Sequence, residues 1–326
     1  MKIYGKSEVR RSLLMMKNSG RFVQSLIFTG AKGTGKHTLS VFTAQLRLCK
    51  TPLPDGAPCG ECRDCRRIAE KIHPDVIYPE KTGVNKIYSR DTIRRVCADA
   101  YIKPSDGDLK IYIFEDFDTT ESLSQNVLLK IIEDPPEGAG FIFTAFDKSV
   151  FLPTVLSRSV TLDLPETTKD EARLALREAL EDKGKYTYEQ IENAVSIFGG
   201  NIGNSVEFLE NGPIARKYEA VINLTEALWA NDEYRLLTAI HGVGDDRQTL
   251  KSVFMMWNKV LRDCTVYSAG ITQFMGCYPE GARKLSNKLT KRRCEKIYRS
   301  VEDFIRRCDT NMNSSICAAA LIADIM

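Results

Sequence analysis

The sequence predicts an α/β domain built on a parallel five-stranded sheet, followed by segments that contain only helices. In residues 1–164, apolar runs typical of buried strands alternate with helical patterns, and this alternation indicates a parallel sheet wrapped by helices. After Pro165, apolar residues recur only at helical spacing. Turn-forming residues mark a further boundary near residue 212. We therefore expect three domains, at residues 1–164, 165–211 and 212–326.

The composition is that of an ordinary globular protein. The chain has 326 residues, of which 43% are hydrophobic and 27% charged, and its net charge is +3. Overall charge therefore gives no affinity for nucleic acid, and any DNA contact would need a local basic patch. No apolar run approaches the roughly 20 residues of a membrane-spanning helix, and the N-terminus lacks the apolar stretch of a signal peptide. We expect a cytoplasmic protein without a membrane partner.

The first expected strand, residues 26–29, leads into a glycine-rich loop typical of phosphate binding. Residues 30–36 follow the pattern Gly-x-x-x-x-Gly-Lys, and a helical pattern begins at Leu39. Glycines allow backbone N–H groups to point at phosphate oxygens, and a lysine adds positive charge beside the positive helix N-terminus. The expected nucleotide-binding residues are Gly30, Gly33, Thr34, Gly35, Lys36, His37 and Thr38.

This loop departs from the pattern at its last position. His37 stands where the pattern has a serine or threonine, whose hydroxyl would hold Mg²⁺. Mg²⁺ prefers oxygen ligands in a tight octahedron, so a neutral imidazole is a poor substitute. We expect a loop that can bind phosphates, weakly holding ATP or ADP, but that is badly equipped for metal-assisted phosphoryl transfer.

The cysteines fall into two groups. Six of the ten are scattered, and we interpret them as buried apolar residues or unreactive thiols. The other four lie close together among prolines and glycines: Cys49, Cys59, Cys62 and Cys65. A long chain without an export signal argues against disulfides, whereas four thiolates on turn-rich backbone suit a closed tetrahedral Zn²⁺ site. Such a site is structural, since it leaves no position for a substrate; the alternative is a set of free surface thiols.

Two carboxylates follow the expected buried strand at residues 109–114. In P-loop NTPases an acidic pair at this place orients Mg²⁺ and polarises the attacking water, so Glu115 and Asp116 are candidate catalytic residues. The alternative is two exposed acids at a strand end. The next helix is closed by Pro135 and Pro136, and further strands are expected at 141–144 and shortly before Leu164.

The order of these motifs resembles the bacterial DNA polymerase III clamp-loader subunits of the AAA+ superfamily, over essentially the whole chain. The similarity rests on the loop at residues 30–36, the four-cysteine insert after its helix, and Ser124-Gln-Asn-Val-Leu-Leu-Lys-Ile-Ile-Glu-Asp-Pro-Pro-Glu137. Ser157-Arg158-Ser159 is similar to the family's Ser-Arg-Cys motif, with its last residue changed. The resemblance implies an AAA+ domain at 1–164, a small helical lid at 165–211 and a helical collar for oligomerisation at 212–326.

Within this family, the ATP-hydrolysing tau/gamma subunit and the delta-prime subunit share the framework. His37 lacks the metal-binding hydroxyl, and the family's Asp-Glu pair is inverted to Glu115-Asp116. The sensor-one threonine falls on Ala145 or Phe146, and the sensor-two arginine falls on Gly203. These losses resemble delta-prime, as do residues 257–263 and Asn311-Met312-Asn313 and the end of the chain after the collar.

The resemblance to delta-prime implies a place in a five-subunit ring that loads a sliding clamp onto primed DNA. Its partners would be gamma/tau-type and delta-type subunits, the clamp and, through the complex, DNA. Arg158 would serve as an arginine finger in a neighbour's ATP site, while the chain's own site would be degenerate. One alternative is a working gamma-type ATPase. A further alternative is a zinc-dependent nucleic-acid-binding module, whose basic face would use Arg63, Arg66 and Arg67.

Overall fold

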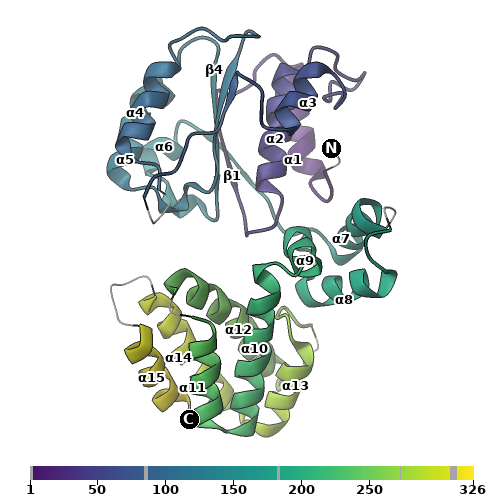
Figure 1. Cartoon of the computed structure of the whole chain (residues 1–326), viewed down its shortest axis with the longest axis vertical. Coiled ribbons are helices and arrows are strands. Elements are labelled where there is room, and N and C mark those ends of the chain that lie inside the picture. Colours follow the sequence, from purple (N-terminus) through teal and green to yellow (C-terminus); the bar gives the residue numbers. More distant parts are fainter. Residues whose placement is uncertain (1–2, 84–86, 182–183, 245, 272, 309–313) are drawn as a thin grey trace. The chain divides into compact units, whose positions relative to one another are not determined.

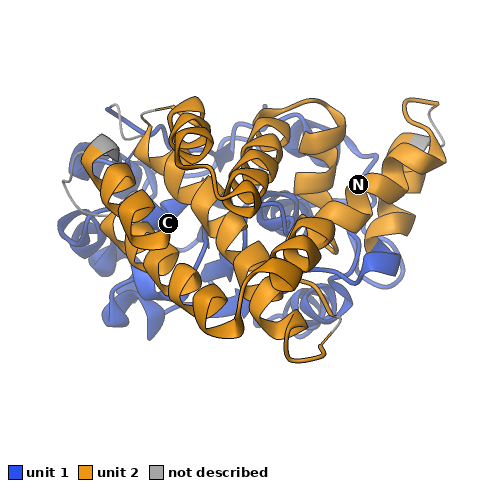
Figure 2. Ribbon diagram, turned by 90° about the horizontal axis from the view of Figure 1, so that it is seen from below, with its two compact units in different colours: residues 1–171 blue, residues 172–326 orange. Residues whose placement is uncertain are grey.

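Figure 1 shows the computed structural model of the chain, which describes residues 3–83, 87–181, 184–244, 246–271, 273–308 and 314–326. The chain forms two compact units, Met1–Glu171 and Ala172–Met326, which Figure 2 shows in separate colours. Nearly all of the predicted lid and all of the predicted collar belong to the second unit. Their separation into two domains stays a prediction, and Asn311-Met312-Asn313 lies outside the described residues.

The first unit is built on the predicted five-stranded parallel sheet, with strand order β2-β3-β4-β1-β5. Its strands are β1 Ser25–Thr29, β2 Val76–Ile77, β3 Lys110–Phe114, β4 Ala139–Ala145 and β5 Val160–Asp163. Thr29 of β1 lies opposite Ala145 of β4 and Asp163 of β5. The loop that leaves β1 therefore emerges in the interior of the sheet, between the ends of two neighbouring strands.

Helices cover both faces of this sheet. On one face lie α1 Ser7–Asn18, α2 Lys36–Leu48 and α3 Arg63–Ala69 (Figure 1). The other face carries α4 Arg90–Asp99, α5 Ser122–Glu133 and α6 Pro153–Leu156. Two short 3-10 turns, η1 Phe117–Thr119 and η2 Lys148–Val150, complete the unit.

Side chains alternate between the two faces along each strand, and both faces are apolar. Leu26 and Phe28 pack in one core with Leu39 of α2, whereas Ile27 packs in the other core with Ile131 of α5. All five are at most 2% exposed. Burial on both faces is the reason that the strands read as continuous apolar runs in the sequence.

The second unit consists of helices. They are α7 Lys169–Leu176, which begins just before the boundary, the π-helical turn η3 Arg177–Glu181, α8 Tyr188–Phe198, α9 Ile202–Leu209, α10 Pro213–Ala230, α11 Glu233–Gly242, α12 Arg247–Tyr267, α13 Pro279–Lys288, α14 Lys291–Arg307 and α15 Ser314–Ile325. None of the described helices is long and apolar enough to cross a membrane.

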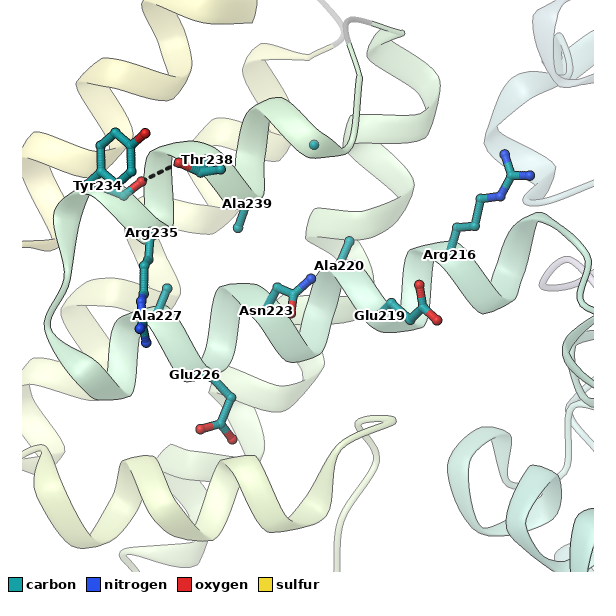
Figure 3. A pocket seen from close by; sticks show the side chains of 11 residues that line it. Arg216, Glu219, Ala220, Asn223, Glu226, Ala227, Tyr234, Arg235, Thr238 and Ala239 are labelled. Atoms are coloured by element: carbon teal, nitrogen blue, oxygen red, sulfur yellow. Dashed lines mark hydrogen bonds between the residues drawn. The ribbon is translucent and has the colours of Figure 1, made fainter.

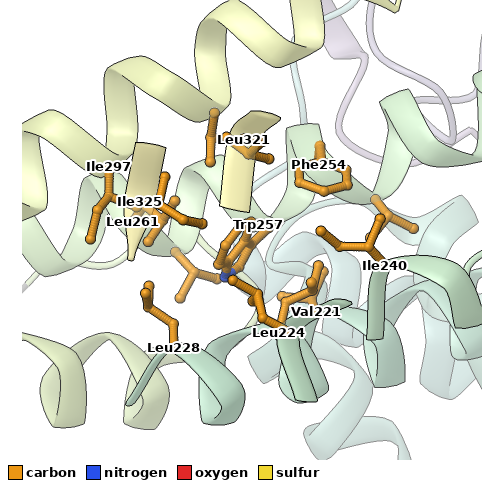
Figure 4. Close-up of a cluster of buried hydrophobic side chains, with 14 of the residues drawn as sticks. Val221, Leu224, Leu228, Ile240, Phe254, Trp257, Leu261, Ile297, Leu321 and Ile325 are labelled. Carbon is orange, nitrogen blue, oxygen red and sulfur yellow. The ribbon is translucent and has the colours of Figure 1, made fainter. Parts of the chain in front are cut away.

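Two hydrophobic cores stabilise this unit. A small one joins Leu176, Leu180, Ile191 and Val195. A large one gathers side chains from α8 and from α10 to α15 around Trp257 of α12, which is fully buried (Figure 4). Each of these helices buries one face in this core, which explains the helical periodicity of the C-terminal sequence.

Candidate functional site

The loop between β1 and α2 has the backbone of a phosphate-binding loop. Gly33 and Gly35 have φ angles of 85° and 89°, in the left-handed region that glycine adopts without strain. Gly35 is also the N-cap of α2, so the loop ends at the positive end of that helix. At Gly30, a Cβ atom would lie 2.5 Å from the carbonyl oxygen of Leu164, which leaves no room for a side chain.

Lys36 is folded back onto its own loop. Its Nζ donates hydrogen bonds to the carbonyl oxygens of Gly30 (2.6 Å) and Ala31 (2.9 Å), and the residue is only 5% exposed. Burial lowers the pKa of the Lys36 ammonium, and the charge of nearby Asp116 opposes this shift. Thr34 also donates its hydroxyl hydrogen to Ala31, at 2.8 Å. A bound phosphate would have to replace these carbonyl oxygens as partners of the ammonium.

His37, in the first turn of α2, lies between the two predicted carboxylates. Its Nδ1 is 3.0 Å from Oε1 of Glu115, and its Nε2 is 3.2 Å from Oδ1 of Asp116. The hydrogen bonds to Asp116 and Glu115 raise the pKa of the imidazole to about 9. The same contact, aided by Lys71, lowers the pKa of Glu115 to about 2. Both ring nitrogens can donate at once only in the protonated ring, so the site holds an imidazolium between two carboxylates.

The acidic pair is held by neighbouring elements. Asp116 has φ 48° and ψ 67°, a left-handed conformation that is uncommon for a residue with a side chain. Its backbone N–H donates to the hydroxyl oxygen of Thr144 at 2.9 Å, and the Tyr88 hydroxyl donates to the carbonyl oxygen of Glu115 at 2.8 Å. Lys71 adds a second cation, with its Nζ 2.8 Å from Oε1 of Glu115. The sequence analysis did not identify Thr144, Tyr88 or Lys71.

The positions expected for the two sensors belong to different units of the chain. Ala145 ends β4, and the N–H of Phe146 donates to Oδ1 of Asp118 at 2.5 Å. Gly203 lies in α9 of the second unit, where it has no side chain to offer. That these positions have lost the two sensor side chains of the family stays a prediction.

The four clustered cysteines come together at one point, and they could hold a metal ion. Their Sγ atoms all lie within 4.8 Å of one another. The separation is 3.6 Å between Cys49 and Cys59 and 4.0 Å between Cys59 and Cys65. Sulfurs around a tetrahedral zinc, with bonds of about 2.3 Å, lie about 3.8 Å apart, so the geometry fits such an ion.

Hydrogen bonds favour the thiolate form of Cys59 that a metal needs, whereas burial raises the pKa of the Cys65 thiol. The N–H of Cys62 donates to Sγ of Cys59 at 3.2 Å, and the Thr51 hydroxyl donates to the same sulfur at 3.3 Å. The Thr51 bond is the main reason that the pKa of Cys59 falls to about 6. Gln45 of α2 donates to the carbonyl oxygen of Cys65 at 2.8 Å, which ties the insert to the helix.

Two of the arginines near the cysteines are already paired. Nη2 of Arg63 and Nη1 of Arg67 lie 2.9 and 2.7 Å from the same oxygen of Asp106. Asp106 thus partly neutralises the basic face that a zinc-dependent nucleic-acid-binding module would require. The structure does not favour that alternative.

Arg158 lies at the edge of the sheet where the strands begin, whereas the phosphate-binding loop lies at the opposite edge, where they end. It precedes β5, and the hydroxyl of the next residue, Ser159, is 2.8 Å from that of Ser25 at the start of β1. The loop instead follows the end of β1, which has five residues and spans about 13 Å. The structure therefore brings the loop and the acidic pair together but keeps Arg158 away from both.

The guanidinium of Arg158 has partners within its own chain. Its Nη2 is 2.8 Å from Oε1 of Glu133, the last residue of α5, and its Nη1 donates to the carbonyl oxygen of Thr154 at 3.1 Å. The arginine and Glu133 line a hollow of about 390 Å³, and 39% of the arginine side chain is exposed. The guanidinium is accessible, and another anion could replace Glu133 as its partner.

A hollow of about 640 Å³ in the second unit lies between α10 and α11. Its rim mixes arginines with glutamates, and the side chains of Arg216, Glu226 and Tyr234 point in different directions (Figure 3). Because these groups do not converge on one point, we assign this hollow no chemistry.

Comparisons with known proteins show which family the chain is similar to. Residues 5–168 match the family model described as "DNA polymerase III, delta subunit". DNA polymerase III subunit tau of Escherichia coli K12 is 27% identical over 181 residues, which cover 56% of this chain and 28% of that protein. DNA polymerase III subunit delta' of Pseudomonas aeruginosa is 28% identical over 172 residues, which cover 53% of this chain and 51% of that protein.

The matched segments thus span about a quarter to a half of the length of these two relatives. Among solved structures, a DNA polymerase III gamma subunit-related protein from Thermotoga maritima aligns with 95% of this chain and 97% of its own. The TM-score is 0.42 and the sequence identity 14%.

Proposed function

The chain belongs to the DNA polymerase III delta-subunit family of AAA+ clamp-loader subunits, and on this premise we propose that it is the delta-prime subunit of its complex. Its function would be to help load the sliding clamp onto primed DNA, together with gamma/tau-type and delta-type subunits. The cytoplasm remains the expected compartment.

One observation carries this proposal: the chain's accessible arginine and its own phosphate-binding loop occupy opposite edges of one sheet. Arg158 cannot reach a phosphate in the chain's own loop across the length of β1. Its guanidinium is permanently charged and can grip phosphate oxygens with two parallel hydrogen bonds. The guanidinium is therefore suited to bind the nucleotide of a neighbouring ATPase subunit. The phosphate would then replace Glu133 as its partner.

The test replaces Arg158 in a reconstituted clamp loader. An arginine finger contributes about 10³- to 10⁵-fold at its own site, and the loss in a multi-site ring is smaller because other sites keep their fingers. Arg158→Ala should preserve assembly but lower clamp loading and DNA-stimulated ATP hydrolysis. Arg158→Lys should rescue little, because an ammonium lacks the two-pronged geometry.

A matched control is Arg10→Ala, since Arg10 is another partly exposed arginine whose Nη2 pairs with a carboxylate, Oδ2 of Asp55 at 3.5 Å. This variant should load clamps at the wild-type rate. Wild-type loading and hydrolysis by the Arg158→Ala complex would contradict the role in trans.

The chain's own nucleotide site would not hydrolyse ATP. His37 occupies both carboxylates, Glu115 and Asp116, that would otherwise serve a metal and a water. Steady-state assays of the purified chain should therefore show negligible turnover, and His37→Thr alone should not restore it. If the chain shows the turnover of a motor subunit and Lys36→Ala abolishes it, the gamma-type alternative is correct instead.

We also propose that the metal held by Cys49, Cys59, Cys62 and Cys65 is Zn²⁺ with a structural role. Four sulfur ligands fill a tetrahedral site completely, and thiolates favour zinc over harder ions.

A further inference from the structure

We propose that the phosphate-binding loop of this chain takes a nucleoside di- or triphosphate without a divalent cation, and that His37 excludes the cation. This inference concerns the chain's own loop and is independent of the action of Arg158 on a neighbour.

The Mg²⁺ that the fold family implies does not fit the residues present. The position next to Lys36 offers an imidazole rather than a hydroxyl oxygen. Each ring nitrogen of His37 is already within 3.2 Å of a carboxylate oxygen, one from Glu115 and one from Asp116. A metal ion would have to displace the ring from both carboxylates, and then nitrogen would replace one of the oxygen ligands that Mg²⁺ prefers.

A second cation reinforces this exclusion. Nζ of Lys71 lies 2.8 Å from Oε1 of Glu115, the same oxygen that faces His37. A divalent ion approaching this carboxylate would meet two positive groups at short range, and like charges repel. The acidic pair is thus saturated by side chains of its own chain.

The same arrangement supplies what a nucleotide's phosphates require. Lys36 and His37 are successive residues in the first turn of α2, whose N-terminus carries partial positive charge. Gly33 and Gly35 have the left-handed φ angles typical of loops whose N–H groups face an anion, whereas the N–H of Gly30 donates to the carbonyl oxygens of Ala145 and Phe146. The positive charge for the phosphates therefore comes from Lys36 and the helix N-terminus, since Glu115 and Asp116 neutralise the charge of His37.

Isothermal titration of the full chain with ADP tests this proposal. The two conditions are buffer depleted of divalent cations over a chelating resin and the same buffer with excess Mg²⁺, at one pH near neutrality. A resin is used because a soluble chelator would also attack the cysteine site. The wild-type dissociation constants should agree within about twofold between the two conditions.

Two variants assign the effect to its residues. His37→Thr places a hydroxyl at the missing position and frees the carboxylates, so ADP should bind about tenfold more tightly with Mg²⁺ than without it. Lys36→Ala should lose ADP binding in both buffers. His241→Thr, at an exposed position in α11 of the second unit, is the matched control and should behave as the wild-type chain.

Three results would overturn the inference. The first is a wild-type affinity for ADP that rises about tenfold with Mg²⁺, and the second is no ADP binding by the folded wild-type chain in either buffer. The third is a folded His37→Thr variant whose affinity stays independent of Mg²⁺, which would remove His37 as the cause. None of these bears on Arg158→Ala in the reconstituted complex, so this inference and the proposed function can fail separately.

Discussion

At the scale of single residues, the contact between one histidine and two carboxylates sets the charge beside the glycine-rich loop. In the sequence, His37 reads as a simple loss of a metal ligand. The structure shows an ion-paired group with contacts of 3.0 and 3.2 Å to Glu115 and Asp116. The substitution therefore removes one interaction and also creates another that holds the acidic pair in place.

We predict that His37 titrates far above an ordinary histidine. The carboxylates raise its pKa from 6.5 to about 9, so its stabilising contribution is present in full below 6.5 and is lost as the pH rises through 9. The pKa of Glu115 falls from 4.5 to about 2, so its contribution is present above 4.5 and is lost as the pH falls through 2. The network should thus be fully formed between about pH 5 and 6.5 and persist to about pH 9.

The measurement is an NMR titration of the three histidine rings. Asp116→Asn should bring the pKa of His37 back toward its ordinary value, because the amide removes the largest cause of the shift. His73 is an internal contrast, since burial lowers its pKa. An ordinary or lowered value for His37 would show that the ring does not bridge the carboxylates in solution.

At the scale of elements, the sequence predicts best what neighbours along the chain determine. The strands, the glycine-rich loop and the four cysteines are local patterns, and the structure contains each of them. The sequence could not show that Lys71 reaches Glu115, because the two residues are 44 positions apart and meet only through tertiary packing. Nor could it show that Glu133 pairs with Arg158, since they belong to elements whose approach depends on tertiary packing.

The cysteine insert gives a prediction at this scale. We expect one tightly bound zinc per chain, and we expect its removal to loosen residues 49–65 while the sheet stays folded. Binding free energy in such a loop is largely folding free energy of the loop itself, whereas the strands have their own apolar cores. Elemental analysis gives the stoichiometry, and hydrogen exchange before and after chelation gives the extent of loosening.

Cys59→Ser should abolish tight zinc binding. Cys97 lies on α4 and is not part of the cluster, so Cys97→Ser should leave zinc binding unchanged. Freshly purified protein with well under one zinc per chain would be incompatible with the site. Exchange that rises throughout the strands after chelation would show that the metal supports the sheet as well.

At the scale of the whole molecule, the chain has two units with cores of their own. Only two tryptophans are present, and both lie in the second unit. Trp257 is fully buried at the centre of the large core, while Trp229 at the end of α10 is 43% exposed. The pair separates the effect of burial from the effect of residue type.

We predict that Trp257→Ala lowers the free energy of unfolding of the second unit by about 3–5 kcal/mol, because it leaves a cavity in a close-packed core. Trp229→Ala, the control, should change it by less than about 1 kcal/mol. Denaturant unfolding followed by circular dichroism makes the comparison. Equal effects of the two substitutions would contradict the described core.

The separation of Arg158 from the phosphate-binding loop also bears on assembly. A subunit that offers an arginine at one edge of its sheet and has a phosphate-binding loop at the other makes heterologous, head-to-tail contacts with its neighbours. Each interface therefore has a direction. If the proposed function is correct, this chain supplies Arg158 to a neighbour's ATP site, but its own site does not hydrolyse ATP and so has no use for a neighbour's arginine. The series of hydrolysing sites in the assembly would therefore end at this chain. The position of this chain among the subunits would set the number of catalytic interfaces.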